Sequence, residues 1–333
     1  MRSSTLETVE TVEPVEILDL RHYTSDDLRH LLDREIDLWA QEMAWDYRSS
    51  AEMILRYINS KILPGYVALE NGRIVGYMFF VYEGNKGVIG DLFVSTNGNA
   101  KSATDSEVQE QLLTHAIETL QQTPGLHRVE AQLLAHRTET VRGPFLREGF
   151  RIFPRLFMQL SLTSLSEGLE VAPHALGEIE LRNWTEADFP SAAQLITAAY
   201  MGHIDSDIND QYRTAGGSLR FLNNIVRFPG CGIFDAPSSL VAVNRSTGRM
   251  VGLLLASRVR EDVGHVTQIC LQPEFRNRGL GRTLLAHCCR SMKARKFSQL
   301  TLTVTEANRT AVELYKRLGF ETKRVFDAFV WEG

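Results

Sequence analysis

Three arginines and two glycines lie together near residue 280, in a pattern suited to binding an anion. The stretch 271–285 reads LQPEFRNRGLGRTLL, with arginines at 276, 278 and 282 and glycines at 279 and 281. It follows an apolar, β-branched segment, 265–271, and leads into a predicted helix from about residue 282. A helix start leaves backbone N–H groups unpaired and carries the positive end of the helix dipole, and glycine lets an anion approach closely. The stretch therefore predicts a pyrophosphate site.

Two common nucleotide-binding motifs do not match this stretch. It lacks the Lys-Ser/Thr ending of a P-loop and has only two of the three glycines of a dinucleotide fingerprint. We therefore expect neither ATP hydrolysis nor NAD binding. Glycines at a strand-to-helix turn can also serve the backbone alone. The chain has a net charge of −5, however, so the three arginines do not reflect a generally basic protein.

A second pattern follows the first along the chain. Asn308 is followed by Ala311, Tyr315, Leu318, Gly319 and Phe320. Arg276-x-x-Gly279-x-Gly281 resembles the Q/R-x-x-G-x-G/A signature of the GNAT family of N-acetyltransferases, and the pattern from Asn308 resembles that family's second motif. Two motifs in the expected order and separation are more specific than either motif alone. The resemblance covers roughly residues 178–333 and extends weakly over 15–162.

The resemblance implies that acetyl-coenzyme A lies across a splayed pair of strands, with its pyrophosphate on the backbone amides of residues 276–282. The strand 267–271 would end in a bulge that frees N–H groups for the pantetheine arm and for the oxyanion formed when an amine attacks the thioester. No metal is implied, and the cysteine spacing does not suit zinc. The residues expected to contact the cofactor are Ile269, Cys270, Leu271, Arg276, Asn277, Arg278, Gly279, Leu280, Gly281, Arg282, Asn308 and Tyr315.

Tyr315 is the expected catalytic residue. It follows Asn308 by two helical turns, so both side chains project from one face of a predicted helix. The family assigns to this position a general acid that protonates the departing coenzyme A thiolate. Two structural alternatives remain, since a tyrosine on an amphipathic helix can be packing and an asparagine can be a helix cap.

The general base is less well defined by the sequence. An attacking ammonium must lose a proton, so a carboxylate, a histidine or a relayed water must reach it. Relatives that acetylate protein N-termini carry Glu on the strand before the asparagine, but a gap-free register places Thr303 there. The candidates for contacting the acceptor come from the loop 201–210 and from two strand ends: His203, Asp205, His265 and Glu306.

An internal repeat divides the chain into two similar halves. Residues 128–150 mirror residues 299–320, each with an apolar strand, a polar break, a short helix and a closing Arg-x-Gly-Phe. We expect an α/β protein with two tandem GNAT-like domains, each a mixed, mostly antiparallel sheet flanked by helices. The predicted parts are a tail (1–14), a degenerate GNAT-like domain (15–163), a linker (164–177) and an acetyltransferase domain (178–333).

The first half lacks several features of the second. Aligning the two Arg-x-Gly-Phe endings puts Phe145 opposite Tyr315 and Thr138 opposite Asn308. Its counterpart of the phosphate loop, 95–107, has one glycine and one lysine, and its two acidic residues would repel a pyrophosphate. We therefore expect one cofactor per chain. We expect the aromatic helix 36–50 to pack toward the core, with contact to the acceptor pocket as the alternative.

The sequence thus predicts an enzyme, an N-acetyltransferase that moves acetyl from acetyl-CoA directly to a primary amine of a small molecule or peptide. Acetylation of a protein N-terminus or lysine is the alternative, and a non-catalytic acyl-CoA sensor is the alternative of another class. The acidic balance argues against nucleic acid as a partner. A polar N-terminal segment and the lack of long apolar runs lead us to expect a cytoplasmic protein without membrane contact, as a monomer or homodimer.

Overall fold

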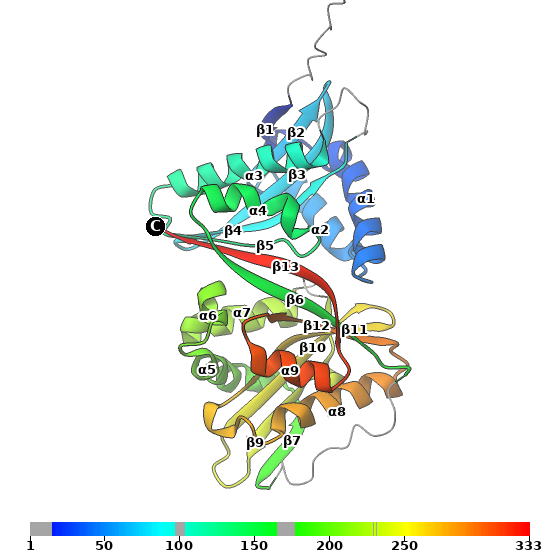
Figure 1. Ribbon diagram of the computed structural model, residues 1–333, viewed down its shortest axis with the longest axis vertical. Helices are drawn as coiled ribbons and strands as arrows, with labels where there is room; N and C mark the ends of the chain where they lie inside the picture. Colours follow the sequence, from blue (N-terminus) through cyan, green and yellow to red (C-terminus); the bar gives the residue numbers. More distant parts are fainter. Residues whose placement is uncertain (1–14, 97–103, 165–176, 229, 231) are drawn as a thin grey trace, which may run out of the picture. The chain divides into compact units, whose positions relative to one another are not determined.

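A computed structural model describes residues 15–96, 104–164, 177–228, 230 and 232–333 (Figure 1). Contacts between residues divide the chain into two units. Unit 1 comprises Met1–Glu35, Ala51–Arg151 and Trp331–Gly333, and unit 2 comprises Ile36–Ser50 and Ile152–Val330. The predicted tail and nearly all of the predicted linker lie outside the described residues.

Unit 1 is built on a sheet with strand order β1-β2-β3-β4-β5. Neighbouring strands are antiparallel except for β4 and β5, which are parallel. The strands are β1 (Glu16–Asp19), β2 (Gly65–Glu70), β3 (Arg73–Glu83), β4 (Lys86–Val94) and β5 (Arg128–Gln132). The helices are α1 (Ser25–Glu42), α2 (Arg48–Asn59), α3 (Asp105–Gln122) and α4 (Thr138–Arg147). The end of α1 and the start of α2 belong to unit 2.

Unit 2 contains the order β13-β6-β12-β11-β10-β9-β7, with β8 beside β10. The strands are β6 (Arg151–Ser161), β7 (Ile179–Asn183), β8 (Ile233–Phe234), β9 (Leu240–Asn244), β10 (Met250–Arg260), β11 (Val263–Leu271), β12 (Gln299–Thr305) and β13 (Glu321–Glu332). The helices are α5 (Phe189–Tyr200), α6 (Asp205–Ile208), α7 (Ala215–Arg227), α8 (Leu280–Ala294) and α9 (Arg309–Arg317).

Helices cover both faces of the sheet in unit 2. The central strand β10 reads MVGLLLASRVR, and an almost continuous apolar run is typical of a strand buried on both faces. Because side chains alternate along a strand, Leu254 and Ala256 pack in the cluster that contains α8 and α9, while Leu253 and Leu255 pack with α5 and α7. This arrangement confirms the predicted mixed α/β fold.

The two units do not follow the division of the chain into halves. Strand β6 precedes the predicted linker, yet it pairs antiparallel with β12 from Ser161↔Gln299 to Arg155↔Thr305. Leu156, Met158 and Leu160 thereby join the apolar core of unit 2. The boundaries 15–163 and 178–333 describe the sequence repeat, whereas the compact units exchange segments across it, and as folding domains those boundaries stay a prediction.

Candidate functional site

Strands β11 and β12 separate after a short paired region. They pair in parallel only over Val263–Val266 with Gln299–Leu302. Beyond this region β11 stays with β10 as far as Leu271, and β12 stays with β6 as far as Thr305. No ladder pairing joins the later parts of β11 and β12, so backbone groups of β11 that face this gap are available to a ligand.

A β-bulge interrupts β11 at the start of the separated part. Val266 pairs with Ala256 and Gln268 pairs with Leu255, which leaves Thr267 as the extra residue. The bulge therefore lies at the start of residues 267–271, not at the end where the sequence analysis expected it. An extra residue changes the direction of the strand locally, and this bend accompanies its departure from β12.

The phosphate loop ends at an uncapped helix. Gly279 is the residue before α8 and has φ of 83°, in the left-handed region that glycine adopts without strain. No side chain caps the helix, and its first turn holds no acidic residue. The N–H groups of this first turn thus have no internal anion, which is the condition for binding an external one.

The three loop arginines have different surroundings. Arg276 donates a hydrogen bond to the carbonyl of Ala199 and thereby ties the loop to the end of α5. The guanidinium of Arg278 lies over the ring of Phe275, 5.5 Å from its centroid, and Arg282 is exposed. Arg278 and Arg282 are therefore the arginines whose charge is more available to a phosphate.

Asn308 and Tyr315 lie at the two ends of α9. The Asn308 side chain caps the helix by accepting a hydrogen bond of 3.3 Å from the Ala311 N–H. Tyr315 is only 6% exposed, and its ring centroid lies 5.8 Å from that of Phe320. Its hydroxyl makes no hydrogen bond to any other described residue. Burial and the nearby Asp205 carboxylate raise the pKa of the Tyr315 phenol well above its usual value, so it is a protonated group able to donate.

Asp205 and His203 form a small polar group at the start of α6. The Asp205 N–H donates to His203 Nδ1 over 3.1 Å, so the neutral ring carries its proton on Nε2. One carboxylate oxygen of Asp205 accepts a hydrogen bond from the Thr305 hydroxyl at the end of β12. The other lies 3.6 Å from His203 Nδ1. This carboxylate is thus held at the separated end of β12.

Two tyrosines that the sequence analysis did not single out complete the site. Tyr200 and Tyr212 stack with their ring centroids 4.4 Å apart. The Tyr200 hydroxyl accepts a 3.2 Å bond from Gln268 and donates a 3.4 Å bond to the Ile269 carbonyl. Burial is the main cause that raises the pKa of both phenols, followed by Tyr212 for Tyr200 and by the Asp205 carboxylate for Tyr212. Tyr200 anchors the end of α5 to β11. Their only sequence signal is their position flanking the loop 201–210.

The remaining candidates have surroundings that suit structural roles. His265 is 5% exposed, with Nδ1 2.9 Å from the Thr301 hydroxyl and the Trp45 ring edge-on at 5.0 Å. Burial, with a smaller effect of the Arg155 cation, lowers the pKa of His265 to about 3, so the ring is neutral. Burial raises the pKa of the Cys270 thiol to about 12, which leaves it a weak nucleophile. Glu306 is exposed just beyond β12.

Part of the chain matches a known protein family. Residues 202–320 match the description of the "Acetyltransferase (GNAT) family". Over these residues the chain is similar to the GNAT family. It is 35% identical over 97 residues to mycothiol acetyltransferase of Thermobifida fusca (strain YX), a match that covers 26% of this chain and 30% of that protein. The chain thus spans under one third of that relative's length.

Two solved structures share the whole fold at low sequence identity. A GNAT protein from Sphaerobacter thermophilus aligns with a TM-score of 0.66 and 16% identity, covering 96% of this chain and 95% of that chain. A tandem GNAT protein from the clavulanic acid biosynthesis pathway aligns with a TM-score of 0.59 and 14% identity, covering 96% and 98%. At such identity these likenesses concern the fold alone.

In unit 1 the counterpart of α8 is α3, and acidic side chains already bond at its start. Helix α3 begins with a capping box in which Thr104 and Glu107 bond each other's backbone N–H groups. Asp105 accepts bonds from the N–H and hydroxyl of Thr96, at 2.8 and 2.7 Å. In α4, the buried Phe145 packs 5.0 Å from Phe150, as Tyr315 packs on Phe320. Unit 1 therefore lacks both the free helix start and the phenol.

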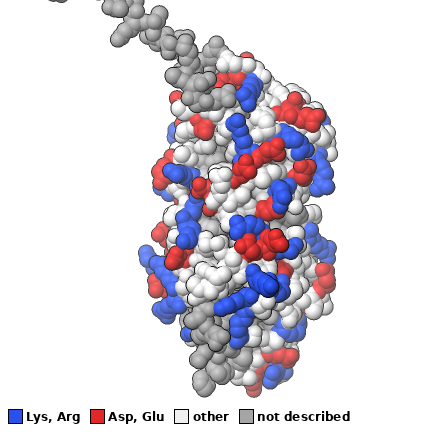
Figure 2. Space-filling model, turned by 90° about the vertical axis from the view of Figure 1, so that its right-hand side faces the viewer, with Lys and Arg blue, Asp and Glu red and all other residues white. Residues whose placement is uncertain are grey.

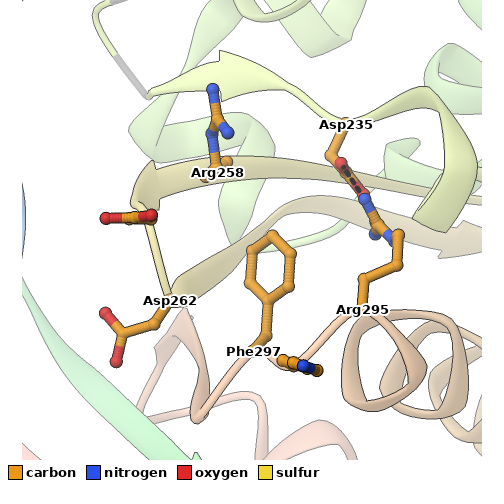
Figure 3. A pocket seen from close by; sticks show the side chains of 7 residues that line it. Asp235, Arg258, Asp262, Arg295 and Phe297 are labelled. Carbon is orange, nitrogen blue, oxygen red and sulfur yellow. Dashed lines mark hydrogen bonds and ion pairs between the residues drawn. The ribbon is translucent and has the colours of Figure 1, made fainter.

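A cavity of about 560 Å³ lies at the far end of β11 from the predicted phosphate loop (Figure 3). Its lining consists of Asp235, Arg258, Glu261, Asp262, Arg295, Lys296 and Phe297. Arg295 makes a two-pronged ion pair with Asp235, at 2.7 and 2.6 Å, and stacks over Phe297 at 5.1 Å. The charges of Arg295 and Asp235 already neutralise each other, and we assign this cavity no part in acetyl transfer.

Three further observations concern the surface and the remaining side chains. Figure 2 shows basic and acidic side chains interspersed on the face it displays. Within the described residues, no group of three or more His, Cys, Asp or Glu side chains is arranged to hold a metal. Among the same residues, no helix has the length and apolar character to cross a bilayer.

Proposed function

We propose that unit 2 is an acetyl-CoA-dependent N-acetyltransferase that transfers acetyl directly to a primary amine. The observation that carries the proposal is the buried Tyr315 phenol on α9, whose apolar cluster also holds Val304 of β12 and has Ile269 of β11 packed against it. The uncapped start of α8 supports it, because it offers N–H groups to a pyrophosphate at the end of the same strand β11.

The proposed chemistry uses backbone and side-chain groups in turn. The amine nitrogen attacks the thioester carbonyl, a C–N bond forms and the carbonyl oxygen becomes negative. N–H groups of β11 beyond Thr267 would stabilise that oxygen, because they are fixed before the reaction. The C–S bond then breaks, and Tyr315 donates its proton to the departing thiolate. The products are an amide and coenzyme A thiol.

Asp205 is the base that we propose for the amine. Its carboxylate influences the pKa of Tyr315 after burial does, so it lies near the phenol. The hydrogen bond from Thr305 holds it at the end of β12. The ammonium gives its first proton to Asp205, directly or through water, and this proton passes on to solvent. The nitrogen loses a second proton after the C–N bond forms, and that proton can return through Asp205 to the Tyr315 phenolate at the end of the cycle. His203 then positions Asp205, because its Nδ1 accepts a hydrogen bond from the Asp205 backbone N–H.

The test compares the parent protein with Tyr315→Phe by coenzyme A thiol release on a panel of amines and peptides. Loss of a general acid lowers rates by about 10²-fold or more, so we expect kcat to fall by that factor. Acetyl-CoA binding by calorimetry should stay at one site per chain in both proteins, since the hydroxyl makes no bond that the fold needs.

Two results would contradict the proposal. Tight coenzyme A binding with no turnover on any amine would indicate the sensor alternative. Equal kcat in the two proteins would remove Tyr315 from catalysis. Preference for peptides over free amines would indicate a protein N-terminus as the acceptor.

A further inference from the structure

A cation without a carboxylate partner lies beside the proposed acetyl-transfer site. Arg155 belongs to β6, and its Nη2 donates a long hydrogen bond of 3.4 Å to the Thr303 hydroxyl. Its Nε is buried and makes no hydrogen bond to any described residue. In the part of the chain that the structure describes, no Asp or Glu forms an ion pair with this guanidinium.

Arg155 as a whole is only partly buried, but its Nε is removed from water without a partner. A buried N–H donor without a hydrogen bond is costly, and a ligand that accepts from it would remove that cost. Guanidinium groups bind carboxylates through parallel N–H bonds, which involve Nε and one Nη or both Nη atoms. The unbonded Nε of Arg155 is one of these donors.

The neighbours of Arg155 place it at the acceptor side of the site. Arg155 is directly opposite Thr305 in the β6–β12 pairing, and Thr305 holds Asp205. Side chains directly opposite on antiparallel strands lie about 5 Å apart at Cβ. Besides burial, the Arg155 cation acts on the pKa of both Tyr212 and His265, so it faces the same region as Tyr212.

The Arg155 cation and the Asp205 carboxylate therefore both lie near the end of β12, without forming an ion pair with each other. Thr305 holds the Asp205 carboxylate, Thr303 accepts from Arg155, and no ion pair joins Asp205 to Arg155 among the described residues. A molecule that carries both an ammonium and a carboxylate complements the two together.

We propose that Arg155 binds a carboxylate of the acceptor, so that the acceptor is a free amino acid or a similar small amine that also carries a carboxylate. This inference rests on the proposed function. The amine lies toward Asp205 and the acetyl group, and the carboxylate lies on the Arg155 guanidinium. A protein N-terminus fits less well, because its first residue has its carboxyl group in a peptide bond.

The test measures kcat/KM for amino acids and for their carboxamides, which differ only in the carboxylate. An ionic hydrogen-bonded contact corresponds to about 10- to 100-fold in binding, so we expect the parent to prefer the carboxylate by at least about tenfold. In Arg155→Met that ratio should fall close to one, mainly through a higher KM for the acid. Arg155→Lys should keep part of the preference, as a cation without the planar fork.

Two controls separate this inference from general damage. Arg290→Met removes one exposed arginine from α8, so it should keep the carboxylate preference of the parent. Circular dichroism and thermal unfolding should show that Arg155→Met folds. An amine phosphate of matched length tests the other common anion.

Each result decides the matter. Equal rates on acids and amides in the parent, or an unchanged ratio in a folded Arg155→Met, would overturn the carboxylate assignment while leaving acetyl transfer intact. Preference for the phosphate over the carboxylate would overturn it too. Absence of acetylation on every amine would overturn the proposed function itself and this inference with it.

Discussion

Tyr315 and Phe145 occupy matching positions in two helices, and a single oxygen atom separates their chemistry. Both side chains are buried, and both pack on a phenylalanine that follows an Arg-x-Gly turn. Only Tyr315 carries a hydroxyl group that can donate a proton. The packing role that the sequence left open for Tyr315 is therefore present, and the hydroxyl without a hydrogen bond is what supports a further role.

His265 makes the stability of the fold depend on pH. Its pKa in the folded protein is about 3, lowered by burial first and by the Arg155 cation second, against 6.5 for the ordinary group. The folded state therefore stays neutral while the unfolded state gains a proton as pH falls through 6.5. The stabilisation is complete above pH 6.5 and is lost progressively toward pH 3, by roughly 2 kcal/mol at pH 5.

Urea unfolding at pH 7.5 and pH 5 measures this effect. The drop in the free energy of unfolding should be smaller in His265→Gln, which has no group that titrates there. Arg155 is the charged group acting on His265, while Trp45, Phe157 and Thr301 surround it with neutral groups. The same drop in both proteins would show that the ring is not neutral in the folded state.

Site residues on separate elements are harder to foresee than those within one motif. The sequence predicts Asn308 and Tyr315 together, because two helical turns separate them on one helix. Arg155 and Tyr200 carry no such signal, since only the sheet and the end of α5 bring them to the site. The contacts of the predicted cofactor-binding residues with acetyl-CoA stay a prediction.

At the scale of elements, α8 and α3 show how the start of a helix decides what it can bind. Both follow a strand that leads out of a sheet, but α3 satisfies its own N–H groups with Glu107, and α8 begins without a cap. An internal carboxylate and an external phosphate would use the same donors. The acidic loop was visible in the sequence, whereas the capping box needed the structure.

The two loop glycines should respond differently to alanine. Gly279 has a left-handed φ of 83°, so Gly279→Ala should lower the free energy of unfolding by about 1–2 kcal/mol. A Cβ at Gly281 would lie 3.6 Å from Leu314 and 3.7 Å from Leu271, which is ordinary contact. Gly281→Ala should therefore raise stability by up to roughly 1 kcal/mol, as alanine favours a helix.

Denaturant unfolding of the two variants measures the contrast, and each is the other's control. If both variants were equally stable, the left-handed conformation of residue 279 would not be required. Acetyl-CoA binding to Gly279→Ala should weaken as well, since the loop backbone must shift to relieve the strain.

Element positions follow well from periodicity. The expected strand 265–271 and helix 282–296 correspond to β11 (Val263–Leu271) and α8 (Leu280–Ala294). The helix starts earlier than expected because Gly279, not Gly281, is the residue with the left-handed turn. The bulge at Thr267 has no local signal, since it depends on pairing with β10 and on separation from β12.

At the scale of the whole molecule, the compact units and the sequence repeat divide the chain differently. The repeat is visible in the sequence, because both halves keep the same motif. The exchange of β6 and of residues 36–50 is not, because strand partners depend on packing between distant segments.

The segment 178–333 should therefore not fold alone. Without β6, strand β12 loses a partner along seven residues, and the core loses Leu156, Met158 and Leu160. Each of these side chains contributes about 1.5–3 kcal/mol on burial, a total comparable with the stability of a small domain. Circular dichroism and urea unfolding of this segment, with the full chain as reference, measure the outcome. A cooperative transition like that of the full chain would contradict it.

The place of β6 in the sheet also constrains how the chain acquires its fold during synthesis. When β6 leaves the ribosome, its partner β12 has not yet been translated, and Leu156, Met158 and Leu160 have no core to enter. The nascent chain must carry an apolar strand with a free edge until β12 emerges, which is a state exposed to aggregation. The emergence of β12, more than completion of the first half, is then the event that commits this part of the chain to its native state.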